Sequence, residues 1–370
     1  GELSPRLDGR NDLAKYSAGC QIVENMVIYP HGAAARRPGT TFIAEVKNSA
    51  KSTRLIPFEF STTQTYVMEF SDQIIRFYKD NGQIQSGGSP FEISSPYLEA
   101  ELFDIKFAQS ADIMYITHPS HKTRTLSRTG HTSWTLAEVN FTNGPFLDSN
   151  ITSTTLTPSA AGTGSRTITA SAVTGINGGS GFLATDVGRQ IHFNSGYGTI
   201  TARTNTTVVT VNVTTAFANA NAITNWFLGA FSDTTGHPAC VTFFEQRLVF
   251  AATINNPQTV YFSRSGDYEN MDANIGGTVA DDDAIIYTIA SNQVNAIRFL
   301  ASTRTLIIGT AGGEFAVTGG GENNAITPTN IMIKKQSNHG AANVDGISVG
   351  NATLFLQRAK RKIRELAYNF

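Results

Sequence analysis

Charged residues are scarce in this chain of 370 residues, and this scarcity limits what the protein can bind. They make up 15% of the sequence, and the formal net charge is −1, whereas about 25% charged residues is usual for soluble domains. A chain with this balance has neither a strongly basic clamp for nucleic acid nor a polybasic patch for a membrane surface. We therefore expect any contact with DNA to be local or non-specific.

Cysteine and long apolar runs are also in short supply. The two cysteines, Cys20 and Cys240, form no CxxC pair and no disulfide framework, so we expect two reduced thiols. No apolar run approaches the ~20 residues that a membrane-spanning helix needs, and the N-terminus lacks the charged-then-apolar pattern of a signal peptide. We expect a soluble protein without a membrane span.

Glycine and aromatic residues are plentiful, and long amphipathic helical windows are absent. The chain has 33 Gly, 23 Phe and 11 Tyr, a composition that favours an all-β fold. One short helix is expected within Asp12 to Val27, inside an otherwise turn-rich N-terminal arm.

A short pattern recurs five times and predicts the architecture. Apolar-any-apolar triplets begin at Ile56, Ile105, Val241, Ile297 and Ile347. Each is followed by a short polar turn and two further apolar stretches. The first of these is expected as a strand at 66–70, 113–117, 248–252, 306–310 and 354–358, and the second at 74–79, 123–128, 259–264, 314–319 and 363–368. The expected unit is a three-strand meander.

The spacing of the triplets distinguishes two all-β architectures. Their third positions lie 49, 136, 56 and 50 residues apart, and the long interval contains a Thr/Gly/Asn-rich segment of about 80 residues. Without that segment the interval matches the others. Strand units repeating at about 40 to 50 residues are typical of a β-propeller. A β-sandwich whose hairpins look alike by chance is the alternative.

These patterns divide the chain into four parts. We expect an N-terminal arm at 1–47, blades one and two at 48–147, an inserted small β-barrel-like domain at 148–228, and further blades at 229–370. The last unit stops after its second strand beyond the triplet, which predicts that the chain is a portion of a longer protein.

Few residues suggest chemistry. His118 and His121 lie three apart at a turn, but no Cys or Glu stands beside them to complete a zinc site, so a structural turn is expected. Asp281, Asp282 and Asp283 lack the EF-hand pattern, so a solvated loop is favoured over a Ca²⁺ site. No nucleophile elbow or phosphate loop is present. The sequence therefore predicts no catalytic, cofactor or metal site, and no enzyme.

Two basic clusters are candidate partner interfaces. The first is Arg36 with Arg37, and the second comprises Lys360, Lys362 and Arg364, which strand alternation would place on one side of a hairpin. An ordinary solvated hairpin is the alternative for the second cluster.

Two long stretches resemble tail proteins of short-tailed bacteriophages, the tail-tube or nozzle family. They are Gly1-Glu-Leu-Ser-Pro-Arg-Leu-Asp-Gly-Arg10 through Ala35-Arg-Arg-Pro-Gly-Thr40, and Leu228 to Phe250 continuing through Pro257 to Tyr268. The inserted segment, through Asp186-Val-Gly-Arg189 and Gly198-Thr-Ile-Thr-Ala202, is similar to the first catalytic-cysteine half-domain of ubiquitin-activating enzymes. That segment contains no cysteine, which excludes ubiquitin-type chemistry.

The resemblance implies a structural virion protein, made in the host cytoplasm and located in the tail. It implies a ring of identical copies, expected as a hexamer, that docks below the portal and its head-to-tail adaptor and carries tail fibres or spikes. Double-stranded DNA would pass through transiently and without sequence specificity. Since each phosphate contact adds affinity, we expect a neutral or acidic lumen, with the basic residues at contacts between rings.

A carbohydrate-binding or glycan-cleaving propeller is the alternative function. Trp134, Tyr197 and Tyr268 are the aromatic residues expected on exposed loops, where they would stack on sugar rings. A glycosidase also needs two carboxylates about 5 to 9.5 Å apart, and the candidates for that pair are Glu245, Asp267, Glu269 and Glu314.

Overall fold

The computed structural model describes residues 1–290, 295–321 and 324–367, and the chain forms two compact units, Gly1–Glu45 and Val46–Phe370. Within the described residues, regular structure consists of β-strands and short 3-10 turns. The predicted all-β class is confirmed.

The N-terminal unit has very little regular structure. It contains a 3-10 turn, η1 (Pro5–Leu7), and a two-stranded sheet of β1 (Met26–Ile28) and β2 (Ala34–Arg36). The predicted helix within Asp12 to Val27 is wrong. The chain there makes successive turns with bonds between residues three apart, such as Tyr16 N to Leu13 O at 2.9 Å, and no continuous α-helical ladder follows them.

No residue of this unit is buried, although all of residues 1–45 are described. Large apolar side chains are instead exposed, among them Ile22, Met26, Val27, Ile28, Tyr29, Phe42 and Ile43. Phe42 is 82% exposed. The unit therefore has no hydrophobic core of its own.

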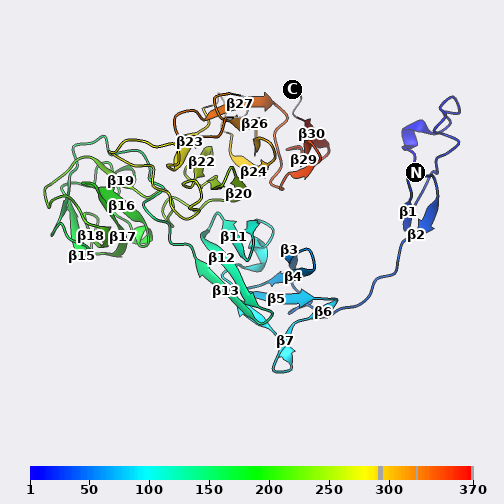
Figure 1. Cartoon of the computed structure of the whole chain (residues 1–370), viewed down its shortest axis with the longest axis horizontal. Helices are drawn as coiled ribbons and strands as arrows, with labels where there is room; N and C mark the ends of the chain where they lie inside the picture. The colour runs from blue at the N-terminus through cyan, green and yellow to red at the C-terminus, as the bar shows by residue number, and fades with distance from the viewer. Residues whose placement is uncertain (291–294, 322–323, 368–370) are drawn as a thin grey trace. The chain divides into compact units, whose positions relative to one another are not determined.

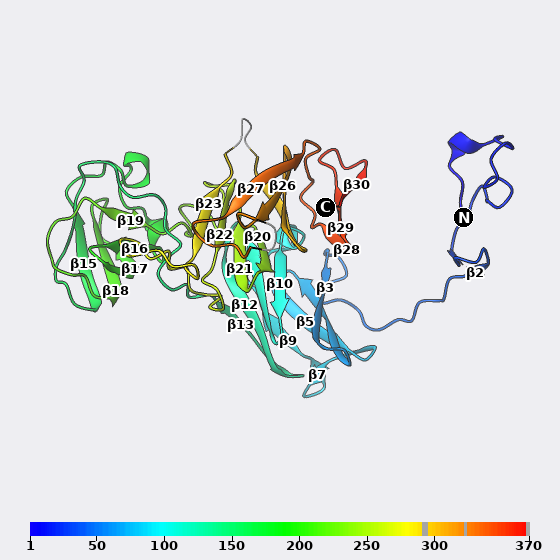
Figure 2. The same ribbon diagram turned by 45° about the horizontal axis from the view of Figure 1, so that its top comes forward.

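The second unit contains five antiparallel sheets in which consecutive strands pair (Figures 1 and 2). Blade 1 has β3 (Arg54–Ser61), β4 (Gln64–Ser71), β5 (Ile74–Lys79), β6 (Gly82–Gln83) and β9 (Glu92–Ser94), with a side hairpin of β7 (Gln85–Ser86) and β8 (Ser89–Pro90). Blade 2 has β10 (Lys106–Ser110), β11 (Ile113–His118), β12 (His121–Gly130) and β13 (Ser133–Glu138). The 3-10 turn η2 (Glu99–Glu101) lies between these two blades in the sequence.

The remaining blades follow the inserted domain. Blade 3 has β20 (Cys240–Phe244), β21 (Arg247–Ala251), β22 (Thr259–Phe262) and β23 (Ile285–Thr288). Blade 4 has β24 (Ile297–Ser302), β25 (Leu306–Thr310), β26 (Gly313–Thr318) and β27 (Met332–Ser337). Blade 5 has β28 (Ile347–Val349), β29 (Ala352–Leu356) and β30 (Ile363–Ala367).

Each pair of successive blades shares one hydrophobic cluster, which identifies the body as a β-propeller. Phe58 and Met114 belong to the cluster between blades 1 and 2, and Tyr115 and Phe250 to the cluster between blades 2 and 3. Further clusters join blade 3 to blade 4 and blade 4 to blade 5. Stacking sheets so that each covers its neighbour's apolar face is the propeller principle.

Four of the five triplets lie within the first strands β3, β20, β24 and β28, and the triplet at Ile105 begins one residue before β10. The following stretches coincide with the second and third strands, as predicted, to within one or two residues at their ends. Tyr368, the end of the last expected strand, lies outside the described residues. The expected three-strand unit is wrong for blades 1 to 4. Blade 1 adds β6 and β9, which both pair with β5. In blades 2, 3 and 4, the strands β13, β23 and β27 each add a fourth strand.

The inserted domain is a six-stranded antiparallel sheet in the order β14, β15, β18, β17, β16, β19. These strands are β14 (Leu156–Pro158), β15 (Gly164–Ala170), β16 (Gln190–Phe193), β17 (Gly196–Arg203), β18 (Val208–Thr215) and β19 (Trp226–Leu228). Mutual bonds between Leu156 and Ile223 bring the β14 edge to the segment before β19, so the sheet is nearly closed. The predicted small barrel-like domain is confirmed, with its own core.

A buried ion pair fixes the inserted domain to the returning chain. Two short 3-10 turns, η3 (Asn177–Gly179) and η4 (Ala184–Asp186), precede Arg189. Arg189 Nη1 lies 2.9 Å from Asp186 Oδ1, and both side chains are buried. Arg189 Nε donates to Gly229 O at 2.8 Å, and Thr234 Oγ1 donates to Asp186 Oδ1 at 2.8 Å.

Candidate functional site

Polar side chains cross the centre of the propeller, where the first strands of the blades converge. The Lys106 ammonium, on β10, donates to the Arg298 carbonyl of β24 and lies 3.0 Å from Asp345 Oδ1. Asn343 Nδ2 donates to Asp104 Oδ1 at 3.0 Å, and Arg54 Nη1 donates to Ile105 O at 2.6 Å. These contacts join blades 1, 2, 4 and 5. Lys106 is buried, and its neighbour Cys240 is a fully buried thiol whose pKa burial raises.

The second polar centre lies at the hairpin between β11 and β12. His118 and His121 are directly opposed across the two-residue turn Pro119-Ser120, so their side chains project to the same face. Their ring centroids are 5.0 Å apart. Glu101, from η2, completes the group, and the possible ligand atoms of the three side chains all lie within 4.8 Å of one another.

The expectation that no carboxylate would stand near this histidine pair is therefore wrong. Glu101 Oε2 lies 2.8 Å from His121 Nε2 and also accepts the Leu98 amide at 2.8 Å, which fixes the carboxylate in place. Glu101 comes from 17 positions upstream of His118 in the sequence. Only the turn η2, which folds back on the hairpin, brings it there.

The surroundings of His118 favour its neutral form. Burial lowers the pKa of His118, and the neighbouring His121 lowers it further. The Tyr97 ring packs edge-on against His121 with centroids 5.3 Å apart, and its buried hydroxyl has no hydrogen-bond partner within the described part of the chain. His237 N donates to Pro119 O at 3.1 Å, and His237 Nε2 lies 2.8 Å from Asp233 Oδ1, which ties the turn to the chain leaving the inserted domain.

The first basic cluster lies in the N-terminal unit. Arg36 ends β2 and is exposed. Arg37 Nε donates to Asn25 Oδ1 at 2.9 Å, so this guanidinium helps to close the β1–β2 ribbon. The structure keeps the two arginines on one short exposed segment, and their role as a partner interface stays a prediction.

The second basic cluster is arranged differently from the prediction. Lys360 lies in the β29–β30 turn with φ of +56°, and Lys360 N donates to Gln357 O at 2.7 Å, so strand alternation does not apply to it. Lys360 and Lys362 are exposed, whereas Arg364 is half-buried in β30 and its Nε donates to Gln357 Oε1 at 3.2 Å. The placement of all three side chains on one face is wrong.

The aspartate run is a structural cap. Arg264 Nη2 contacts Asp282 Oδ2 at 2.5 Å and Asp283 Oδ1 at 3.4 Å. The Arg264 hydrogen bond lowers the pKa of Asp282. Arg247, buried beneath the run, donates to the carbonyls of Asp281 and Asp283 at 2.7 Å each. The predicted loop is present, but Asp283 is buried rather than solvated.

The aromatic residues named for sugar stacking serve mainly as packing. Trp134 is buried and stacks on Phe77 with ring centroids 4.3 Å apart, and Tyr197 is also buried. Tyr268, half-buried, packs edge-on against Phe243. The expected exposure of Trp134 and Tyr197 is wrong.

The candidate carboxylates also have structural partners. Glu245 Oε2 accepts the Ile326 amide at 2.6 Å, Glu269 Oε1 accepts the Tyr115 hydroxyl at 3.2 Å, and Glu314 accepts the Ser337 hydroxyl. Asp267 Oδ2 accepts the Asn270 side-chain amide at 3.0 Å. Asp267 thus serves a turn and Glu314 a strand pair, whereas Glu245 and Glu269 join residues of different blades.

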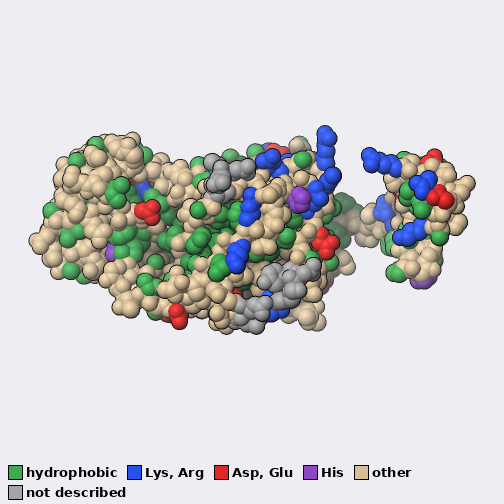
Figure 3. Space-filling model, turned by 90° about the horizontal axis from the view of Figure 1, so that it is seen from above, with side chains coloured by type: hydrophobic (Ala, Val, Ile, Leu, Met, Phe, Trp, Pro, Cys, Tyr) green, Lys and Arg blue, Asp and Glu red, His purple; other side chains and the backbone are tan. Residues whose placement is uncertain are grey.

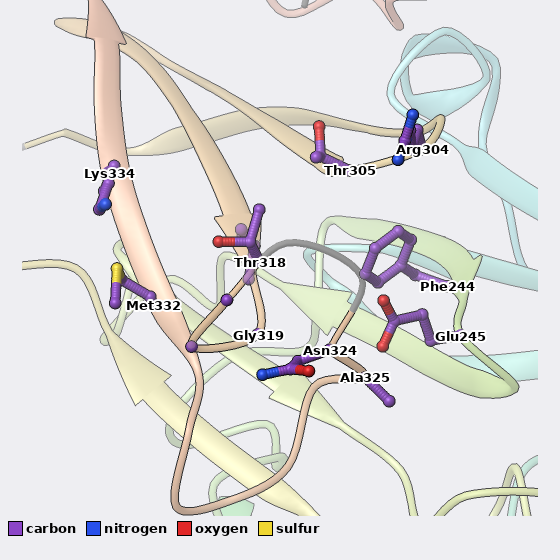
Figure 4. Close-up of a pocket in the computed structure, with 13 residues that line it drawn as sticks. Phe244, Glu245, Arg304, Thr305, Thr318, Gly319, Asn324, Ala325, Met332 and Lys334 are labelled. Atoms are coloured by element: carbon purple, nitrogen blue, oxygen red, sulfur yellow. The ribbon is translucent and has the colours of Figure 1, made fainter. Parts of the chain in front are cut away.

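A pocket of about 420 Å³ lies beside Glu245 (Figure 4). Phe244 ends β20 and Glu245 follows it in the β20–β21 turn. Arg304 and Thr305 come from the β24–β25 turn, and Met332 and Lys334 from β27. Glu245 is held by the Ile326 amide rather than by a second acid. Among the lining residues that the structure describes, Glu245 is the single carboxylate. The pocket therefore lacks the pair of acids that a glycosidase needs.

The surface is mainly uncharged. The face shown in Figure 3 carries scattered Lys and Arg side chains rather than a continuous basic stripe. Within the described residues, no helix is both long and apolar enough to cross a bilayer.

Comparisons with known proteins assign no family. No family model matches the chain, and no curated protein sequence matches it. Among solved structures, the chain is similar to the endosialidase of phage phi92, with 12% identity, a TM-score of 0.24, and coverage of 82% of this chain and 48% of the endosialidase. The chain therefore spans about half the length of that protein.

Two further structures align over more of their length. YCF48 bound to D1 peptide shows 12% identity and a TM-score of 0.22, with coverage of 85% and 95% of the two chains. The computationally designed Ika8 protein shows 12% identity and a TM-score of 0.21, with coverage of 87% and 98%. Likenesses at this level assign neither an activity nor a partner.

Proposed function

We propose that this chain is a structural component of a phage tail that assembles with copies of itself into a ring. The observation that carries the proposal is the N-terminal unit, in which no residue of 1–45 is buried and several large apolar side chains face solvent. A segment that buries so little apolar surface has no internal source of stability. It gains one by packing against another protein surface.

The partner we propose for this segment is a neighbouring copy in the ring or the adaptor ring above it. The sequence of the same segment, from Gly1 to Thr40, resembles the tail-tube or nozzle family. Its apolar residues would supply buried contact area, and Arg36 with Arg37 would supply charged contacts at the rim of the interface.

The body suits a ring subunit. Stacked blades with a core at each interface form a rigid block, and short strands leave little exposed edge for uncontrolled pairing. In this proposal the chain catalyses no reaction, tail fibres or spikes attach outside, and a near-neutral surface lets DNA pass without being held. Its location is the tail of the virion.

The carbohydrate alternative is not favoured. It depended on exposed aromatic residues, and Trp134 and Tyr197 are buried.

Light scattering of the full chain, alone and with the cognate adaptor ring, tests the proposal. We expect a particle near six times the 39.8 kDa chain mass, either spontaneously or only on the adaptor. The double variant Ile28→Ser/Phe42→Ser removes apolar surface from the N-terminal unit and should weaken assembly at least tenfold. The matched control Leu55→Ser/Ile286→Ser changes exposed apolar residues of the body and should leave assembly unchanged.

Two outcomes would contradict parts of this proposal. A chain that stays monomeric at all concentrations and ignores the adaptor would overturn the ring proposal. Assembly that survives loss of both apolar side chains would show that the N-terminal unit does not drive it.

A further inference from the structure

We propose that Glu101, His118 and His121 form a binding site for a divalent transition metal of the zinc class. The inference stands on the geometry of these three side chains and is independent of the proposed ring. Two imidazoles and one carboxylate are a common protein ligand set for zinc, with Zn–N distances of about 2.0–2.1 Å. Hard cations such as Ca²⁺ and Mg²⁺ prefer oxygen ligands instead.

The spacing of the ligand atoms fits an ion with small adjustments. All three lie within 4.8 Å of one another, whereas ligands on a tetrahedral zinc ion are about 3.4 Å apart. Rotation of side chains at the end of a hairpin covers that difference without moving the strands. His118 is buried, while the side chains of Glu101 and His121 are 22% and 23% exposed, so an ion can enter and keep water as a fourth ligand.

Backbone structure holds the two histidines on one face. They are the paired ends of a two-residue hairpin, and Pro119 restricts the turn that joins them. The β11–β12 ladder therefore fixes the separation of the two Cβ atoms. Glu101 is fixed by the amide of Leu98. A site assembled on strand ends and a short turn is largely preorganised, which limits the entropy cost of binding.

Metal binding displaces two hydrogen bonds of the cluster whose loss costs little free energy. The Glu101–His121 hydrogen bond of 2.8 Å gives way to two bonds to the ion. The Ser120 amide donates to His118 Nδ1 at 3.2 Å. Because Ser120 is exposed, water can accept the hydrogen bond of this amide when the imidazole binds metal. Metal binding therefore leaves no buried charged group without its partner.

The location suggests what the ion would do. Pro119 O accepts the His237 amide, and Asp233 holds the His237 ring. Thr234, next to Asp233, donates to Asp186 of the inserted domain. An ion on the hairpin would therefore join η2, blade 2 and the returning chain at one point, and stabilise the place where the inserted domain leaves the propeller.

Calorimetric titration of Zn²⁺ into the metal-stripped, tag-free full chain tests the site. We expect one zinc ion to bind per chain. When the free zinc concentration is 100 times Kd, Tm should rise by a few degrees. Glu101→Gln, His118→Asn and His121→Gln should each weaken binding by at least about 100-fold, because even substitutions beyond the direct ligands cost 10–100-fold. His339→Gln, at an exposed histidine outside the cluster, should bind as the unmodified chain does.

Two measurements keep the outcomes separate. The Tm and circular dichroism of each metal-free variant show whether it folds, and near-isosteric Glu101→Gln is the variant expected to fold most like the parent. X-ray absorption of the zinc-loaded chain should show scattering from two imidazole ligands, with Zn–N distances near 2.0–2.1 Å. Failure of the unmodified chain to bind zinc, or folded Glu101→Gln and His121→Gln variants that bind it normally, would overturn the proposal.

Discussion

The blade interfaces and the N-terminal unit use similar apolar residues with opposite results. Phe58, Phe250 and Phe299 are fully buried between sheets, whereas Phe42 is 82% exposed. Burying a side chain of this size contributes about 1.5–3 kcal/mol, so each blade interface is stabilised within the chain. Two three-residue strands cannot build a comparable core. The difference teaches that the body carries its own stability and the N-terminal unit does not.

The largest effect that tests this comparison is the loss of a core phenylalanine. Phe250→Ala opens a cavity in the cluster between blades 2 and 3 and should reduce the free energy of unfolding by about 3–5 kcal/mol. Phe42→Ala should change it by less than about 0.5 kcal/mol. Urea or thermal unfolding of both variants measures the contrast. Equal losses would mean that the N-terminal unit is packed in solution.

A smaller effect is expected at the centre of the propeller. Lys106→Ala leaves the carbonyl of the half-buried Arg298 without this donor, which costs about 1–3 kcal/mol. The control is Lys15→Ala, at an exposed lysine of the N-terminal unit, which should be nearly neutral. Comparison of unfolding midpoints at pH 7 checks the pair. If the Lys106→Ala variant is as stable as the parent, the contacts of Lys106 do not contribute to the free energy of unfolding.

The smallest effect concerns pH. Burial lowers the pKa of His192, with Asp272 opposing weakly. The ring packs between Phe146 and Phe227. A histidine whose folded pKa lies below its unfolded value of about 6.5 costs stability as pH falls below that unfolded value, because the unfolded chain binds the proton more readily.

We therefore expect Tm to fall between pH 7 and pH 5. His192→Phe should reduce that dependence without abolishing it, because burial also lowers the pKa of His118 and of His237, whereas His31→Gln in the N-terminal unit should leave it unchanged. Differential scanning calorimetry across this range decides the matter. A slope that persists unaltered in His192→Phe would assign the dependence to other groups.

The inner strands were predictable because their signal is local. Each triplet alternates apolar residues over a few positions, and the pleat of a strand requires that alternation on a half-buried surface. The fourth strands were not predictable in the same way. β27 contains Lys334, Lys335 and Gln336 at exposed positions, and β23 follows β22 only after a long loop. Their pairing depends on a neighbouring strand edge that already exists.

The metal candidate shows the same limit. The His118–His121 spacing is visible in the sequence, but Glu101 joins it only through the fold of η2. At the second basic cluster, Lys360 lies with positive φ in the turn between β29, which ends at Leu356, and β30, which begins at Ile363, so the strand that alternation assumed is absent there. Local patterns predict elements, whereas sites assembled from separate elements need the tertiary structure.

Lys106 has one more consequence. Its side chain reaches from blade 2 to the Arg298 carbonyl of blade 4 and to Asp345 before blade 5, so protein atoms span the space between these three blades. In the proposed ring, double-stranded DNA would therefore pass between copies rather than through the centre of one. The width of that passage would be set by the number of copies in the proposed ring rather than by the fold of one.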